Sequence, residues 1–263
     1  MSKIKILTGW GHPGGSTFAH INLCNVLNEG GLDCTLYSPH QWHHGKCKSG
    51  SFNDIKLSED DIIIYHFLNI WKERPPVKKL ILSLHEKELY PLKEKPTEIF
   101  DAIHFLNEDQ KDWHGYEGAN HFFCPNAHEE LKKFEGVKSR TAGIIGNIDP
   151  NKNVHTSIER ALKDGHDKIR IFGTINDHNY YNQQIKPFMT GDDIVKYVGF
   201  AEKQNIYDLV TDVYHSSTSE NASFIVDECT MTGVTLHGND QTKEQPIIPN
   251  EDIFEIWKLV LGV

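Results

Sequence analysis

The sequence lacks the features that mark membrane-spanning and secreted proteins. No run of about 18 apolar residues occurs in the 263 residues, so we expect no spanning helix and no membrane insertion. The apolar stretch in MSKIKILTGWGHPGG is too short for a signal peptide. The five cysteines are odd in number, widely spaced and without a CxxC pair, which argues against a disulfide framework. We therefore expect a reducing, cytoplasmic setting.

Basic charge and metal-ligand patterns are also scarce. The 27 Lys and Arg residues face 37 Asp and Glu residues, giving a net charge of −10. A nonspecific grip on nucleic acid needs many neutralising cations, so this balance weighs against one. His43 and His44 stand near Cys47, but their spacing matches no standard zinc pattern. Asp60–Asp61 and Asp192–Asp193 precede expected strands instead of following them, so we expect no metal site.

What the chain does have is two sets of short apolar strands that alternate with helices. This alternation predicts an α/β fold of two Rossmann-like, doubly wound domains facing a cleft. The expected strands include residues 3–10, 32–39, 61–67, 78–85, 102–107 and 121–126 in the first half, and 141–148, 168–174, 194–200 and 233–237 in the second. We expect domains at 1–135 and 136–263, joined through a short charged helix within 127–140. The last helix, 250–262, can pack back on the first domain.

Two carboxylates stand eight positions apart in the stretch SSTSENASFIVDECTMTG (216–233). Glu220 is followed by the small residues Asn221, Ala222 and Ser223, which predict a loop that enters a helix carrying Glu228. Backbone N–H groups at a helix start favour phosphate, and a carboxylate further inward suits a sugar hydroxyl. The plain alternative is a surface loop followed by an amphipathic helix.

Seven short motifs follow one another along most of the chain. They are the Gly14–Gly15 loop, DIIIYHF (61–67), LILSLHE (80–86), FFCPNAHEELKKF (122–134), GIIGNIDPNKN (143–153), YVGF (197–200) and the Glu220–Glu228 pair. Each is weak alone, but in this order they resemble the retaining glycosyltransferases of family 4, in a compact phage or bacterial form. The resemblance implies the GT-B fold and a nucleotide-diphosphate sugar, expected to be a UDP-sugar, as donor substrate.

The resemblance also implies roles for residues of the second half. Lys152 would contact the leaving diphosphate, Glu228 the ribose, and Glu220 the donor sugar. The backbone of 221–223 would add N–H donors, and Asn147 would lie at the donor where the family usually has an arginine. A solvated turn is the alternative for Lys152, because DPNKN also has the composition of a surface turn.

In the first half, His85 corresponds to the histidine that the family often places near the donor sugar. Gly14 and Gly15 would let the first loop approach the donor, although a tight strand–helix turn explains them equally well. His66 is a weaker candidate and can be a structural histidine. The catalytic set implied by the resemblance is therefore His85, Lys152 and Glu220.

This chain departs from the family pattern at several positions. Asn147 removes one expected cation, Ala127 stands where the family commonly has glycine, and Cys229 takes the place of an alanine. The chain is also shorter than most members. These differences leave Lys152 as the main candidate for binding the diphosphate.

The expected activity is a metal-independent, retaining transfer of a hexosyl or pentosyl group that requires no cofactor. Two acceptor classes remain open. One is hydroxymethylated pyrimidine in DNA, as some phage enzymes use, which would place the protein in the host cytoplasm. The other is a glycan or a small molecule. A non-catalytic nucleotide-sugar-binding protein and a nucleotide-sugar epimerase of similar fold are further alternatives.

Overall fold

The chain forms two compact α/β units in a computed structural model. The structure describes residues 3–9, 14–39, 45–66, 73–86, 92, 97–240, 242 and 247–263. The first unit comprises 1–129 together with 248–263, and the second comprises 130–247. Each unit contains one parallel sheet with helices on both faces, as the alternation of strands and helices predicts. Among the described helices, none is long and apolar enough to cross a bilayer.

The first unit is built on a seven-stranded sheet in the order β3-β2-β1-β4-β5-β6-β7. Its strands are β1 (Ile4–Thr8), β2 (Cys34–Ser38), β3 (Ser49–Ser51), β4 (Ile62–His66), β5 (Lys79–Ser83), β6 (Ala102–Phe105) and β7 (His121–Phe123). All neighbouring pairs are parallel. The strand order reverses between β1 and β4, and α/β sheets bind ligands at the carboxyl ends of the strands at such a reversal.

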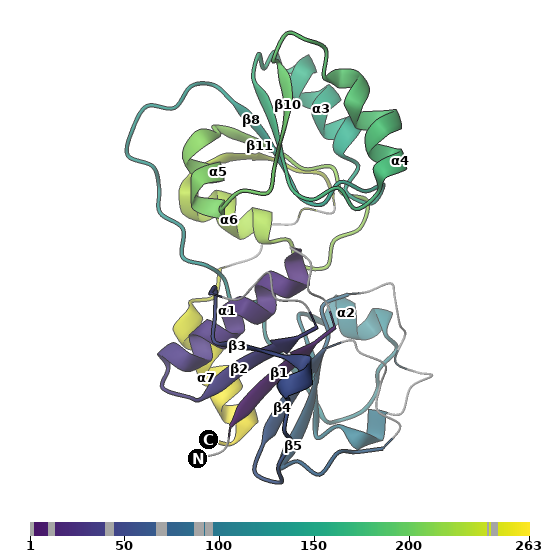
Figure 1. The fold of residues 1–263 in the computed structure, drawn as a ribbon, viewed down its shortest axis with the longest axis vertical. Helices are drawn as coiled ribbons and strands as arrows, with labels where there is room; N and C mark the ends of the chain where they lie inside the picture. Colours follow the sequence, from purple (N-terminus) through teal and green to yellow (C-terminus); the bar gives the residue numbers. More distant parts are fainter. Residues whose placement is uncertain are drawn as a thin grey trace. The chain divides into compact units, whose positions relative to one another are not determined.

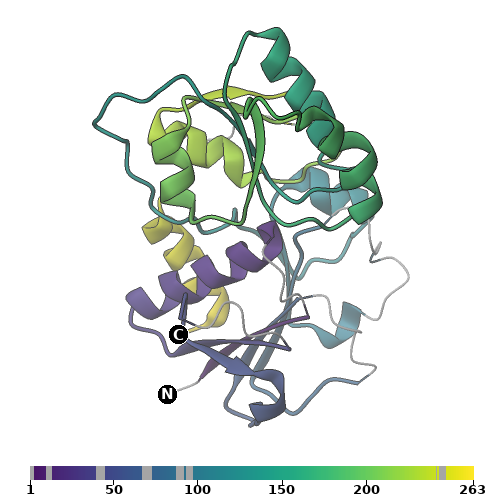
Figure 2. The same ribbon diagram turned by 45° about the horizontal axis from the view of Figure 1, so that its top comes forward.

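Helices cover the first sheet on both faces. They are α1 (Gly15–Glu29), α2 (Glu108–Trp113) and α7 (Asn250–Leu261), with short 3-10 turns at Phe52–Asp54 and Thr97–Ile99. Alternate residues of β4 face opposite sides, so that Ile62 and Ile64 pack in one core and Ile63 and Tyr65 in the other. The helices α1 and α7 lie side by side over the first of these cores (Figures 1 and 2).

The second unit is built on a five-stranded sheet in the order β10-β9-β8-β11-β12. Its strands are β8 (Ala142–Ile145), β9 (Ile169–Phe172), β10 (Val195–Gly199), β11 (Asp212–Tyr214) and β12 (Thr235–His237). They too pair in parallel. Here the order reverses between β8 and β11, which again marks the carboxyl ends of these two strands as the expected ligand-binding edge.

Helices lie on both faces of the second sheet (Figure 1). They are α3 (Val154–Lys163), α4 (His178–Tyr180), which runs on into helical turns to Phe188, α5 (Lys203–Leu209) and α6 (Phe224–Thr232). Ile144 and Ile171 pack against α3, whereas Ile145 and Phe172 pack with residues of α5 and α6. The helix α6 ends at Gly233, whose φ of +68° is the left-handed conformation that glycine adopts without strain.

The charged helix expected within residues 127–140 does not form, so this prediction is wrong. The segment is irregular. Ala127 packs in a core of the first unit and Leu131 in a core of the second, so these residues do not form one apolar helix face. The backbone of Lys132 pairs instead with the Gln204 side chain, through hydrogen bonds of 2.9 Å from Lys132 N and to Lys132 O.

Candidate functional site

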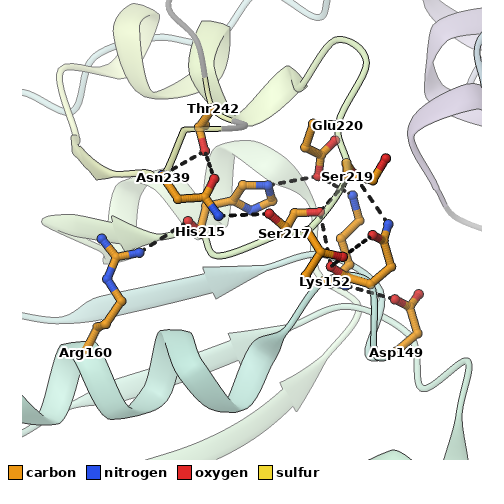
Figure 3. A network of polar contacts seen from close by, with 11 residues as sticks. Asp149, Lys152, Arg160, His215, Ser217, Ser219, Glu220, Asn239 and Thr242 are labelled. Carbon is orange, nitrogen blue, oxygen red and sulfur yellow. Dashed lines mark hydrogen bonds and ion pairs between the residues drawn. The ribbon is translucent and has the colours of Figure 1, made fainter. Parts of the chain in front are cut away.

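The strand reversal of the second unit gathers a lysine, a glutamate and a histidine, here called the Lys152 cluster. Lys152 lies in the turn between β8 and α3, while His215 and Glu220 follow β11. Lys152 Nζ lies 2.5 Å from Glu220 Oε1, and His215 Nε2 lies 2.9 Å from the same oxygen. Figure 3 shows the side chains of Lys152 and His215 directed toward this carboxylate. The structure therefore brings together two of the three residues expected to be catalytic.

Local sequence explains how the Lys152 turn is held. Asp149 Oδ1 accepts a hydrogen bond of 3.0 Å from Lys152 N, the usual way in which an aspartate closes a turn (Figure 3). Asn151 O accepts a bond of 2.8 Å from Thr218 N, which ties this turn to the loop that carries Glu220. The two loops thus hold each other, and Lys152 is fixed near the end of β11.

Charge governs the protonation of Glu220. Its side chain is only 10% exposed. Burial alone would raise its pKa, but the hydrogen bond from His215 and the charge of Lys152 lower the pKa to about 2. Glu220 is accordingly an anion at neutral pH, and it holds the Lys152 ammonium at the carboxyl ends of the strands.

Asn147 follows β8 in the same unit. Its Oδ1 accepts a hydrogen bond of 3.0 Å from Thr174 Oγ1. The backbone approach here is close, because a Cβ on Gly173 would lie 1.9 Å from Gly146 O. Gly173 also has a φ of +141°, so only glycine fits this contact. Asn147 therefore lies at the carboxyl ends of β8 and β9, just beyond the last residue of β8 instead of inside the expected strand 141–148.

Glu228 has different partners from Glu220. It is the fifth residue of α6, little more than one turn from the helix start, and it is 4% exposed. Tyr207 donates a hydrogen bond of 2.7 Å to Oε2, and Lys203 Nζ lies 2.5 Å from Oε1. Burial together with the Glu228 charge raises the pKa of the neighbouring Asp227 to about 6.

The small residues between the two glutamates lie where a helix begins. Ser223 is the N-cap residue of α6, and Asn221 and Ala222 precede it. Side-chain capping of α6 by Ser223 is absent. The first backbone N–H groups of α6 thus have no capping hydroxyl, and such groups suit an anionic ligand.

The first unit brings four histidines together at its strand ends, here called the histidine cluster. Three of them, His20, His66 and His104, are buried, and the fourth, His85, is partly buried. The His20 ring lies 4.4 Å from that of His66 and 4.6 Å from that of His85, between ring centroids. His85 and His104 lie 5.8 Å apart. Burial lowers the pKa of His20 and of His85 well below the usual value, and that of His104 to about 4. These three imidazoles are neutral at pH 7.

Glu86 anchors the start of α1 beside this cluster. Its carboxylate accepts a hydrogen bond of 2.7 Å from Ser16 Oγ and lies 3.1 Å from His66 Nε2. Ser16 follows Gly15, the first residue of α1, and Gly14 is the N-cap residue. A Cβ on Gly15 would meet nothing within 4 Å, so the described surroundings impose no steric need for glycine there.

Sequence inspection missed several of these partners. His215 follows β11 directly, and its place at a strand end could have indicated it. Glu86, in LILSLHE, could also have been found in this way. Lys203 and Tyr207 give no such signal, since their pairing with Glu228 depends on α5 packing beside α6.

Among the described residues, no three His, Cys, Asp or Glu side chains are arranged to hold a metal ion. Cys47 is described, whereas His43 and His44 lie outside the described residues.

Comparison with known proteins places this geometry in a fold. No family model matches the sequence, and no curated protein matches it. Solved structures do. TarM matches with a TM-score of 0.69 at 11% identity, over 100% of this chain and 92% of TarM. The protein has the GT-B glycosyltransferase fold.

Two further GT-B structures are similar over nearly the whole chain. The pneumococcal O-GlcNAc transferase GtfA, in complex with UDP and GlcNAc, has a TM-score of 0.66 at 10% identity, covering 99% of this chain and 91% of GtfA. AviGT4, a glycosyltransferase involved in avilamycin A biosynthesis, has a TM-score of 0.64 at 12% identity, covering 100% of this chain and 88% of AviGT4. At such low sequence identities, structural similarity establishes the fold alone, and the fold does not determine the activity.

Proposed function

We propose that the protein is a retaining, metal-independent glycosyltransferase that moves a sugar from a nucleotide-diphosphate sugar to an acceptor hydroxyl. The observation that carries this proposal is the Lys152 cluster at the strand reversal of the second GT-B unit. A buried glutamate holds an ammonium there, within a fold whose known examples include glycosyltransferases.

Each member of the cluster has a defined task in this proposal. Departure of a nucleoside diphosphate develops negative charge on its phosphate oxygens, and an oriented ammonium stabilises that charge most at the transition state. Lys152 supplies the ammonium. Glu220 orients it and binds the donor sugar, and His215 orients Glu220 through their hydrogen bond of 2.9 Å.

The remaining donor contacts follow from the placement of α6 and of β8. The backbone N–H groups after residues 221–223 bind phosphate oxygens, and Asn147 adds an amide beside them. Glu228 accepts hydrogen bonds from the ribose hydroxyls. These bonds either replace the contact between Glu228 and Lys203 or form beside it. In the first unit, His85 binds a hydroxyl of the donor sugar, and the Gly14–Gly15 turn lies close to the ligand.

We propose a UDP-sugar as donor, supported by the UDP found in the complex of the similar GtfA. The net charge of −10 favours a glycan or small-molecule acceptor over hydroxymethylated DNA. All five cysteines are free thiols, which supports a reducing compartment such as the cytoplasm.

The proposal is tested first by binding. Melting temperatures are measured with UDP, GDP, ADP and their glucose, galactose and N-acetylglucosamine conjugates, since a ligand that binds only the folded state raises the melting temperature. One nucleotide series should stabilise the protein. Stabilisation by none of these compounds would refute the assigned donor site.

Turnover then separates the alternatives. Slow hydrolysis of the selected donor in the presence of EDTA indicates transfer chemistry without a metal, and the anomer formed with an acceptor reports retention. Interconversion of the nucleotide sugar indicates an epimerase, and binding without turnover indicates a sensor. Lys152→Ala should lower turnover strongly, whereas Lys163→Ala, on the exposed side of α3 in the same unit, should leave it unchanged. Hydroxymethylated DNA and oligosaccharides are compared as acceptors by mass spectrometry.

A further inference from the structure

A chain of hydrogen bonds runs from His85 across the carboxyl ends of three neighbouring strands. His85 Nε2 lies 3.1 Å from Ser83 Oγ, at the end of β5. Ser83 Oγ lies 2.9 Å from His104 Nδ1, on the neighbouring strand β6. His104 Nε2 lies 2.7 Å from the carbonyl oxygen of Cys124, just after β7. The strand register supports this chain of hydrogen bonds, because Ser83 and His104 are direct cross-strand partners in β5 and β6.

The carbonyl at the end of the chain fixes the direction of every bond. A carbonyl oxygen only accepts, so His104 carries its hydrogen on Nε2. His104 is neutral, since burial lowers its pKa to about 4, and its Nδ1 therefore accepts. The single hydroxyl hydrogen of Ser83 is donated to that nitrogen. Ser83 Oγ can then only accept from His85, which must carry a hydrogen on Nε2.

Packing holds the middle of the chain in place. The His104 ring stacks on Phe122 at 5.1 Å between centroids and meets the edge of Trp257, from α7, at 5.0 Å. Ser83 is fully buried and His104 is 2% exposed. Neither side chain has room or solvent with which to reverse its hydrogen bonds.

Asn126 also lies near the His85 side chain, and its amide raises the pKa of His85 against the larger lowering by burial. An amide side chain presents either an oxygen or a nitrogen to its partner, so Asn126 adapts to whichever proton arrangement His85 adopts. The Cys124 carbonyl cannot adapt in this way. The hydrogen bonds through Ser83 and His104 to the Cys124 carbonyl therefore determine the tautomer of His85.

We propose that Ser83 and His104 are positioning residues that hold His85 as its Nε2–H tautomer, so that Nδ1 accepts a hydrogen bond from a sugar hydroxyl. The recognition half of this statement rests on the proposed function, whereas the tautomer does not. A ligand group without a hydroxyl hydrogen, such as a methyl ether, would be rejected at this nitrogen.

The tautomer is tested directly on the unliganded protein. Long-range ¹H–¹⁵N correlation spectra of the ¹⁵N-labelled chain distinguish protonated from bare imidazole nitrogens, and His85→Gln assigns the signals. The expected wild-type result at pH 7 is a protonated Nε2 and a bare Nδ1. Ser83→Ala removes the acceptor of Nε2–H and should give a mixture that contains the Nδ1–H form. Ser38→Ala, at a buried serine that ends β2 in the same sheet, is the matched control and should leave the spectrum unchanged.

Recognition is tested by the ratio of affinities for UDP-N-acetylglucosamine and UDP. Ser83→Ala should lower this ratio by about fivefold, the typical effect of one hydrogen bond, with UDP affinity unchanged. A protonated Nδ1 in the wild type, or an unaltered spectrum in Ser83→Ala, would overturn the proposal that Ser83 and His104 set the tautomer of His85. A changed tautomer with an unchanged ratio would overturn sugar recognition by His85. If neither compound binds, the donor proposal fails while the spectra still decide the tautomer.

Discussion

Glu220→Gln tests the electrostatic design of the Lys152 cluster through stability. The substitution keeps the shape of the side chain but removes the anion that Lys152 and His215 share. The pKa of Glu220 falls from the ordinary value of 4.5 to about 2 on folding. Each pKa unit corresponds to about 1.4 kcal/mol, so the ionised carboxylate contributes about 3 kcal/mol to the free energy of unfolding at pH 7.

The sign of the pH dependence follows from the lowered pKa. The contribution is fully present above pH 4.5, the unfolded value, and is lost as pH falls through 2. The difference in unfolding free energy between wild type and Glu220→Gln should therefore shrink from about 3 kcal/mol at pH 7 to roughly 1 kcal/mol at pH 3.

The assay must report on the second unit. The segment 130–247 contains no tryptophan, so tryptophan fluorescence follows only the first unit. Urea unfolding is instead measured by far-UV circular dichroism, with hydrogen exchange of β8 and β11 peptides to localise the change. Glu135→Gln, at an exposed glutamate of the same unit, is the control. If Glu220→Gln follows the wild type at every pH, as the control should, the electrostatic argument is refuted.

Four further outcomes are expected. Lys152→Ala should lower turnover about 100-fold with little loss of donor affinity, as measured by steady-state kinetics, because its charge acts most strongly at the transition state. Glu228→Ala should weaken UDP binding about tenfold in calorimetry, since it removes a charged acceptor, and equal affinity would reject the ribose assignment. Trp257→Ala should destabilise the first unit by about 3–5 kcal/mol in chemical unfolding, because the side chain is 1% exposed. Gly173→Ala should cost on the order of 2 kcal/mol through its close contact and positive φ, and an unchanged melting temperature would contradict this.

Most of the fold could be predicted from the sequence because buried parallel strands have a strong local signal. The run of β4 is apolar on both faces, and α7 has an apolar face ended by a glycine. The helix predicted within 127–140 was wrong because helix propensity does not show where the chain crosses from the core of one unit to the core of the other. Tertiary packing decided that segment.

The candidate site was predictable only in part. The sequence indicates Lys152 and Glu220 separately, but their contact depends on two loops 68 residues apart meeting at the ends of β8 and β11. The relay behind His85 depends on the register that sets Ser83 opposite His104. Such cross-strand pairs have no local signature, because strand order is a property of the whole sheet.

The position of α7 has a consequence for how the chain acquires its structure. Ile253, Trp257 and Leu261 complete a core whose other members come from the first half of the sequence. The second unit, by contrast, is a continuous segment. During synthesis all residues of the second unit emerge before α7, which the first unit needs to complete its core. The strands of the first unit therefore keep an uncovered apolar face until α7 has been made. Trp257 packs against His104, so the hydrogen bonds that join His85, Ser83 and His104 are among the last parts of the molecule to become ordered. In a nascent chain the His85 site therefore forms only after α7 has emerged.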